Sequence, residues 1–214
     1  MTKRHYSPAD QLLMNLDQAV KTLFGKPEIT ERAYPAKEAG TDDLTQEQSK
    51  DIAGLMRVNH TGEVCAQALY QGQALTARLP RVRTSMERAA QEENDHLEWC
   101  HNRLDELGSH TSYLNPLWYA GSFAIGATAG LIGDKWSLGF VAETEKQVVK
   151  HLESHLQQLP DDDARSRSIL EQMKVDEERH GTAALQAGGA ALPQPIKTMM
   201  GVTSKIMTAI AYRI

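Results

Sequence analysis

Six side chains carry the chemistry that this sequence is best suited to perform. They are Glu63, Glu93, His96, Glu145, Glu177 and His180. Four of them form two Glu-x-x-His patterns, and residues three apart lie on the same face of a helix, where both can bind one cation. Carboxylate oxygen and imidazole nitrogen together suit iron or manganese ions. The sequence therefore predicts a metal site, and we assign the same six residues to catalysis.

The helical register of Glu145 distinguishes it from an ordinary surface acid. With 100° per residue, apolar side chains along 138–159 project within about 40° of Glu145. The neighbouring Glu143 points about 160° away, so the same helix supplies a control. The other three glutamates of the set are flanked by apolar residues in the same way. All four are therefore predicted to point into the protein.

Buried glutamates need a partner of opposite charge. An ionised carboxylate costs several kcal/mol to bury when it is unpaired, and no lysine or arginine lies on these apolar stripes. A multivalent cation is the partner that we predict. The alternative is that the glutamates are protonated or bridged by water. A third Glu-x-x-His pattern, Glu98 with His101, is excluded because Glu98 lies about 140° from the stripe.

Four long helices must position these residues. Prolines rarely occur inside helices, and the prolines of this chain divide its middle into four long stretches. The helices are predicted at 45–77, 81–107, 136–159 and 161–187. Thr45 and Gln48 form a capping pattern at the start of the first. The acids at 161–163 suit the positive start of the last helix, which ends before Gly188.

The distribution of the six ligands over the four helices indicates the fold. One glutamate from each of two helices, with Glu-x-x-His from each of the other two, is the arrangement of ferritin-like dinuclear sites. We therefore predict an all-α protein, a ferritin-like four-helix bundle with an additional apolar helix and a C-terminal amphipathic helix. Its cofactors are predicted to be two metal ions.

Composition and charge exclude several classes. The chain has 214 residues, which suffices for one core, and its low aromatic content of 6% disfavours a β-sandwich. A net charge of −5 argues against nucleic acid as a partner. Two cysteines cannot form a disulfide framework, so a reducing compartment fits best. The N-terminus has no apolar run typical of a secretory signal, which favours the cytoplasm.

Three segments lie outside the four helices. Residues 1–44 form an N-terminal peripheral segment with a short helix at 10–24, residues 45–192 form the bundle, and residues 193–214 form the amphipathic tail helix. Within the bundle, residues 117–133 carry no charge. This run is short and rich in glycine and alanine for a membrane span, so we place it against the bundle or at a membrane interface. The alternatives are a plain buried helix for 117–133 and a packing helix for the tail.

Several motifs resemble one family. RVNHTGE at 57–63, EENDH at 92–96, PLW at 116–118 and DEERH at 176–180 together are similar to demethoxyubiquinone hydroxylase. The resemblance covers about residues 50–214, and RVNHTGE is its most specific element. The ligands of that family match Glu63, Glu93, His96, Glu145, Glu177 and His180.

The resemblance implies a function. It implies a di-iron monooxygenase that hydroxylates the ring of 2-polyprenyl-3-methyl-6-methoxy-1,4-benzoquinol with O2 in ubiquinone biosynthesis. Two iron ions (Fe2+/Fe3+) per chain and O2 as co-substrate follow from it. A polyprenyl substrate suggests a peripheral protein on the cytoplasmic side of the cell membrane. A homo-oligomer or ubiquinone-pathway protein partners are further expectations.

Four residues are candidates for supporting roles. Asp176, and less so Asp95, could accept the second ring proton of a ligand histidine from across the site. An exposed helical acid is the alternative for either. Tyr70 shares the face of Glu63 and is a substrate candidate, or else a core tyrosine. The resemblance assigns an inward histidine to His151, although by register it points about 120° from Glu145.

Two other functions use the same bundle. The first is a ferritin-like iron-storage or ferroxidase protein, which has no need of a charge-free segment such as 117–133. The second is a di-iron oxygenase for another substrate, either another lipid or a tRNA base. The acidic net charge argues against tRNA.

Overall fold

The computed structural model describes residues 8–25, 29–30, 32–40 and 43–214. These residues form seven α-helices and one short 3-10 helix, with no strand among them. The elements are α1 (Pro8–Phe24), η1 (Pro35–Lys37), α2 (Gln46–Thr76), α3 (Pro80–Glu106), α4 (Asn115–Ile132), α5 (Asp134–Gln158), α6 (Ala164–Gln186) and α7 (Gln194–Ala211). The predicted all-α, ferritin-like bundle is confirmed, and its four long helices are α2, α3, α5 and α6.

The helices begin where local chemistry allows it. Thr45 and Gln48 form the predicted capping box before α2. Pro80 occupies the first turn of α3, where its missing N–H is not needed. At α6 the N-cap is Asp163, whose Oδ1 accepts the backbone N–H of Ser166 at 2.9 Å. These signals are local, which is why the sequence predicts the bounds to within a few residues.

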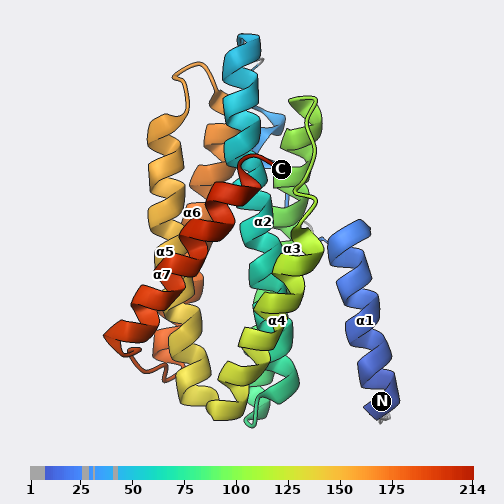
Figure 1. Ribbon diagram of the computed structural model, residues 1–214, viewed down its shortest axis with the longest axis vertical. Coiled ribbons are helices and arrows are strands. Elements are labelled where there is room, and N and C mark those ends of the chain that lie inside the picture. The colour runs from blue at the N-terminus through green and yellow to red at the C-terminus, as the bar shows by residue number, and fades with distance from the viewer. Residues whose placement is uncertain (1–7, 26–28, 31, 41–42) are drawn as a thin grey trace.

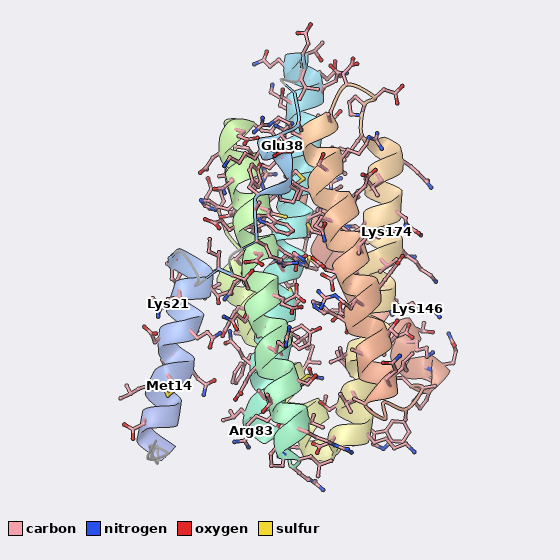
Figure 2. The ribbon with its side chains drawn as sticks, turned by 180° about the vertical axis from the view of Figure 1, so that it is seen from behind. Met14, Lys21, Glu38, Arg83, Lys146 and Lys174 are labelled. Carbon is pink, nitrogen blue, oxygen red and sulfur yellow. The ribbon has the colours of Figure 1, made fainter. Side chains whose placement is uncertain are left out.

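The bundle is built from two antiparallel hairpins. Helix α2 packs on α3 and α5 packs on α6, while α4 and α7 lie in front of them in Figure 1. Seen from behind, α3 and α6 are nearest the viewer and α1 stands beside α3 (Figure 2). The two hairpins therefore face each other across the middle of the molecule.

Two hydrophobic clusters fill the two halves of the bundle. One is built around residues such as Met56, Cys100 and Met173, and the other around residues such as Met86 and Ala184. On each long helix, the glutamate predicted to bind metal falls between a residue of one cluster and a residue of the other. The polar site is therefore enclosed by apolar packing on both sides.

Helix α4 approaches α2 closely through glycines. A Cβ placed on Gly126 would come 2.3 Å from the carbonyl oxygen of Leu69, and one on Gly72 would come 2.4 Å from that of Phe123. Only glycine permits this separation of two backbones. The opposite side of α4 is exposed at Leu117, so a plain buried helix is not what the structure shows.

Helix α7 is the predicted tail helix and crosses α5. Lys197 pairs with Glu143 of α5 at 3.1 Å, which places Glu143 outside the bundle core as its register predicts. Arg57 of α2 donates from Nη1 to the carbonyl oxygen of Tyr212 at 2.9 Å. In the described parts of the chain, no helix combines the length and apolar character needed to cross a membrane.

The N-terminal helix α1 agrees with the predicted helix at 10–24. Its exposed apolar residues include Leu13 and Phe24. The division of the chain at residues 44 and 192 stays a prediction. The described part of segment 1–44 also contacts α3 and α6, because Arg32 pairs with Asp95 and Asp176.

Candidate metal centre

Four of the six predicted ligands converge in the middle of the bundle. Glu63 of α2, Glu93 and His96 of α3, and Glu177 of α6 each offer one ligand atom, and these atoms lie within 4.8 Å of one another. Nδ1 of His96 is 2.9 Å from Glu93 Oε2, 3.2 Å from Glu177 Oε1 and 3.6 Å from Glu63 Oε2. All four side chains are buried. This group could hold a metal ion.

The other two predicted ligands border this group. Nδ1 of His180 lies 3.1 Å from Glu93 Oε1 and 3.4 Å from Glu177 Oε2. Glu145 is only 2% exposed, and its Oε1 accepts a hydrogen bond from the hydroxyl of Tyr70. Thus all four glutamates are buried as their register predicts. The excluded Glu-x-x-His pattern lies apart from the cluster. Its His101 is exposed, and Nε2 of this ring lies 3.6 Å from Asp105 Oδ2.

Several buried ligand atoms lack a hydrogen bond. Among the described residues these include Glu93 Oε1, Glu145 Oε2, Glu177 Oε2 and His180 Nδ1. Buried polar atoms in folded proteins are nearly always satisfied, so such a concentration requires an explanation. A cation bound between them would supply the missing interactions, and the donor types fit iron or manganese.

The electrostatics of the group are unfavourable without a cation. Burial, together with the carboxylates of Glu93 and Glu177, raises the pKa of Glu63 well above its usual value. Burial and the same two neighbours also raise the pKa of Glu145. Burial opposes protonation of His180, but the Glu177 and Glu93 carboxylates outweigh it and raise the pKa of this ring to about 12. Metal binding must therefore displace protons from this site.

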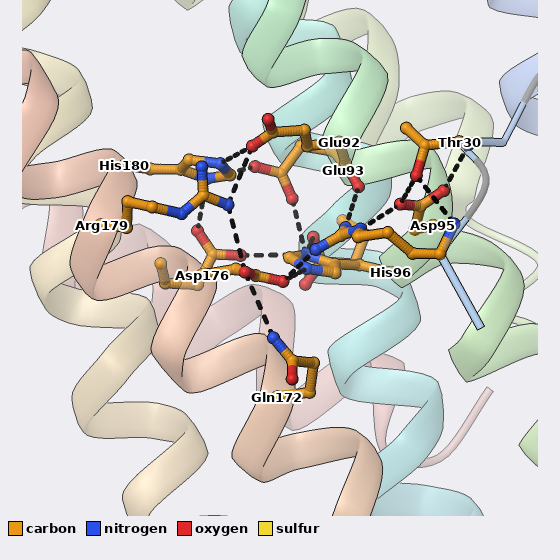
Figure 3. A network of polar contacts seen from close by, with 12 residues as sticks. Thr30, Glu92, Glu93, Asp95, His96, Gln172, Asp176, Arg179 and His180 are labelled. Atoms are coloured by element: carbon orange, nitrogen blue, oxygen red, sulfur yellow. Dashed lines mark hydrogen bonds and ion pairs between the residues drawn. The ribbon is translucent and has the colours of Figure 1, made fainter. Parts of the chain in front are cut away.

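Each histidine of the cluster is supported by a carboxylate from the facing helix. Nε2 of His96 donates to Asp176 Oδ2 at 3.0 Å, and Nε2 of His180 donates to Glu92 Oε2 at 2.7 Å (Figure 3). With Nε2 engaged, Nδ1 of each ring faces the cluster. Such contacts fix the ring orientation of histidines that bind metals.

These contacts agree with the supporting role predicted for Asp176 and correct the one predicted for Asp95. Asp176 lies across the site from His96, where we expected it. Among the described residues, Asp95 accepts hydrogen bonds from Thr30 and Arg32 rather than from a histidine. Glu92 was missed, although the sequence offers a signal: it precedes Glu93 as Asp176 precedes Glu177.

Arg179 connects the two supporting carboxylates. Its Nη2 donates to Glu92 Oε2 at 3.0 Å and to Asp176 Oδ1 at 3.1 Å. The two halves of the site are therefore linked by hydrogen bonds outside the cluster as well as inside it.

Tyr70 and His151 occupy different surroundings. Tyr70 is buried beside Glu145 and lines a cavity of about 140 Å³ that His180 and Glu92 also border. His151 is outside the cluster, and its ring centroid is 3.9 Å from that of His155. The role that the resemblance assigns to His151 stays a prediction.

Comparisons with known proteins place the chain in a family. The family model described as "Ubiquinone biosynthesis protein COQ7" matches residues 50–211. The chain belongs to this family. It is 59% identical to a protein of Nitrosococcus oceani over 99% of both chains, and 58% identical to one of Ectopseudomonas mendocina over 100% of this chain and 99% of the other. Both relatives are named 3-demethoxyubiquinol 3-hydroxylase.

In this COQ7-family chain, Asp176→Asn is expected to weaken metal binding. Asparagine keeps the size of Asp176 but loses the charge that orients the Nε2–H of His96. Loss of such a supporting group typically costs about 10–100-fold in metal affinity. Anaerobic titration with ferrous ion against a chromophoric chelator measures the effect. An unchanged affinity would make Asp176 an ordinary helical acid.

His155 is expected to give this COQ7-family chain a pH-dependent stability. Burial lowers the pKa of His155 to about 3, and its Nδ1 donates to Asn59 Oδ1 at 2.9 Å. Because the unfolded chain binds this proton near pH 6.5 and the folded chain does not, stability falls as pH drops below about 6.5. The stability advantage of wild type over His155→Gln should therefore shrink between pH 7 and pH 5.

Urea unfolding of the metal-free proteins at both pH values tests this expectation. The difference between the two proteins isolates His155 from the other titrating groups. A difference that is the same at pH 7 and pH 5 contradicts the prediction.

Proposed function

We propose that this chain is a di-iron monooxygenase that hydroxylates the ring of 2-polyprenyl-3-methyl-6-methoxy-1,4-benzoquinol with O2 in ubiquinone biosynthesis. The observation that carries the proposal is the buried cluster of carboxylates and histidines with unsatisfied ligand atoms. The names of the relatives support the reaction, since they are 3-demethoxyubiquinol 3-hydroxylases.

The six predicted ligands would hold two iron ions. They are Glu63, Glu93, His96, Glu145, Glu177 and His180. When bound there, two ferrous ions would supply the redox chemistry that activation of O2 requires. Asp176 and Glu92 keep both histidine Nε2 atoms protonated, so that Nδ1 is the ligand atom of each ring.

The cavity beside His180 is the proposed site for the quinol ring. It is lined by apolar residues such as Met86 and Val141 and by polar residues such as Glu92 and Arg179. The apolar walls would exclude water from the reacting ring. Glu92 can accept a hydrogen bond from a quinol hydroxyl and Arg179 can donate one to its oxygen. Tyr70 borders both this cavity and Glu145, and we assign it a role in positioning the substrate.

One assay tests the proposal. The metal-free protein is loaded with ferrous iron without oxygen, its metals are counted, and O2 and the methoxy-quinol are added. Two irons per chain and a product heavier by one oxygen atom are expected. Two irons without hydroxylation would retain the metal centre and overturn the reaction. A cage-sized particle with many irons per chain would indicate storage instead.

We also propose that the protein binds peripherally to the cytoplasmic side of the cell membrane. Met199, Val202 and Ile206 of α7 are exposed at helical spacing, with Lys205 exposed beside them. The charge-free outer side of α4 adds exposed apolar residues such as Leu131. An amphipathic helix of this kind can lie in a membrane interface, with its cations near anionic headgroups.

Flotation with vesicles that contain anionic lipid tests this association. The wild-type chain should float with the vesicles and be released by salt with mild detergent. The triple serine variant of Met199, Val202 and Ile206 should stay unbound. A matched control replaces Val175 and Leu185, exposed apolar residues of α6, with serine and should still float. Equal behaviour of both variants, or no flotation of wild type, contradicts the proposal.

A further inference from the structure

The N-terminal segment reaches the metal centre through one arginine. Arg32 lies between α1 and η1, and its guanidinium contacts carboxylates of α3 and α6, the helices that carry the two Glu-x-x-His patterns. Its Nε is 2.5 Å from Asp95 Oδ2 and its Nη1 is 2.5 Å from Asp176 Oδ2. Its Nη2 donates to the carbonyl oxygen of Glu92 at 3.2 Å, and its Cζ lies 4.9 Å from the centroid of the Trp99 ring.

Arg32 and a cluster histidine share one acceptor atom. Oδ2 of Asp176 receives both the Nη1–H of Arg32 and the Nε2–H of His96. The position of this oxygen therefore depends on the guanidinium and, in turn, sets the direction of the imidazole ring. We propose that Arg32 is a positioning residue that fixes Asp176 and, through it, the orientation of His96 toward the bound metals.

The second carboxylate anchors the segment in place. Asp95 is 1% exposed and precedes His96 on α3. It accepts the backbone N–H of Thr30 at 2.7 Å and the Thr30 hydroxyl at 2.5 Å, in addition to Arg32. These bonds hold the Nε side of the Arg32 guanidinium against α3, while its Nη1 contacts Asp176 of α6. A guanidinium suits this task because its planar donors can engage two carboxylates at once, which a single ammonium does less well.

A purely structural link between α3 and α6 is the competing explanation. The chain contains such a link elsewhere. Arg165 of α6 donates to Glu106 of α3 from Nε at 3.0 Å and from Nη2 at 2.6 Å. Neither residue contacts the cluster side chains in the described structure. Arg165 is therefore a matched control that joins the same two helices away from the metal centre.

Metal affinity distinguishes the two explanations. Full-length Arg32→Met, Arg32→Lys and Arg165→Met are prepared metal-free, and ferrous ion alone is titrated anaerobically against a chromophoric chelator. Thermal unfolding of each metal-free variant is measured in parallel. Arg32→Met should bind ferrous ion about 10-fold more weakly. Arg32→Lys should recover part of that loss, and Arg165→Met should stay within about two-fold of wild type even where its unfolding temperature falls.

A double-variant cycle tests the route through Asp176. If Arg32 acts through this carboxylate, Arg32→Met should weaken binding by no more than about two-fold further in the Asp176→Asn background. Wild-type affinity of Arg32→Met, or losses from the two substitutions that multiply, would overturn the inference. If Arg32→Met does not fold, Arg32→Lys replaces it in the same cycle with Asp176→Asn.

The inference rests on the proposed function only in that the cluster binds metal. The titration needs neither O2 nor quinol, so its outcome is separate from the hydroxylation assay. A wild-type protein that binds two irons without hydroxylating the quinol would overturn the proposed reaction and leave the assignment of Arg32 intact.

Discussion

Replacing Glu63 with glutamine is expected to abolish tight metal binding and, at the same time, to stabilise the metal-free protein. Burial, with the nearby carboxylates of Glu93 and Glu177, raises the pKa of Glu63. A group with a raised folded-state pKa contributes stability below its unfolded pKa and loses that contribution as pH rises through the folded value. Glutamine mimics the neutral form at every pH. The stability of the metal-free variant relative to wild type should therefore increase as pH increases.

The gain in unfolding free energy should be on the order of 1 kcal/mol and larger at pH 8 than at pH 6. Hydroxylation should fall by about 1000-fold, because a metal centre lowers the activation barrier by several kcal/mol and the variant loses this stabilisation. Denaturant unfolding at both pH values, metal counting and the quinol assay measure these effects. Glu98→Gln is the matched control, since Glu98 lies outside the cluster, and it should keep its metals. A Glu63→Gln protein that binds two irons normally would refute the ligand assignment.

Metal loading is expected to raise the unfolding temperature by about 10 °C or more. A ligand at 1000 times its Kd stabilises the folded state by about 4 kcal/mol. In a protein of this size each kcal/mol corresponds to about 2–4 °C. The effect should be large because bound cations replace the repulsion among buried carboxylates and satisfy the ligand atoms that lack hydrogen bonds.

Anaerobic melting with increasing ferrous or manganous ion measures this shift. The unfolding temperature should rise with metal concentration and return to the metal-free value on addition of a chelator. Glu63→Gln should show little shift under the same conditions. A wild-type unfolding temperature that does not respond to either metal would contradict the presence of a metal centre.

The sequence predicts most of the fold because its signals are local. Thr45 with Gln48, Pro80 and Asp163 each mark a helix start within one turn, and the structure has helices there. The inward direction of a glutamate such as Glu145 follows from the helical period and the apolar residues around it. Burial of a charge on an apolar stripe can thus be recognised without knowing which helices pack together.

The missing parts of the site depend on contacts between distant segments. Arg32 is 63 residues from Asp95 and 144 from Asp176 in sequence, and it belongs to a stretch without helical periodicity. No pattern in segment 1–44 indicates which carboxylates it meets. Glu92 is different, because the internal similarity of residues 92–96 and 176–180 makes it the counterpart of Asp176. The sequence signal for Asp95 was its place next to a histidine, but on a helix adjacent residues face different directions.

The glycines between α2 and α4 have a consequence for how the surface relates to the reaction centre. Because the backbones meet at Gly72 and Gly126, no side chain separates the two helices at these two positions. Helix α2 carries Glu63, so the outer side of α4 is held at a constant offset from that carboxylate. The distance from the outer surface of α4 to the cluster is therefore set by contact between the two main chains. One added methyl group at Gly126 would push α4 away from α2 and change that distance.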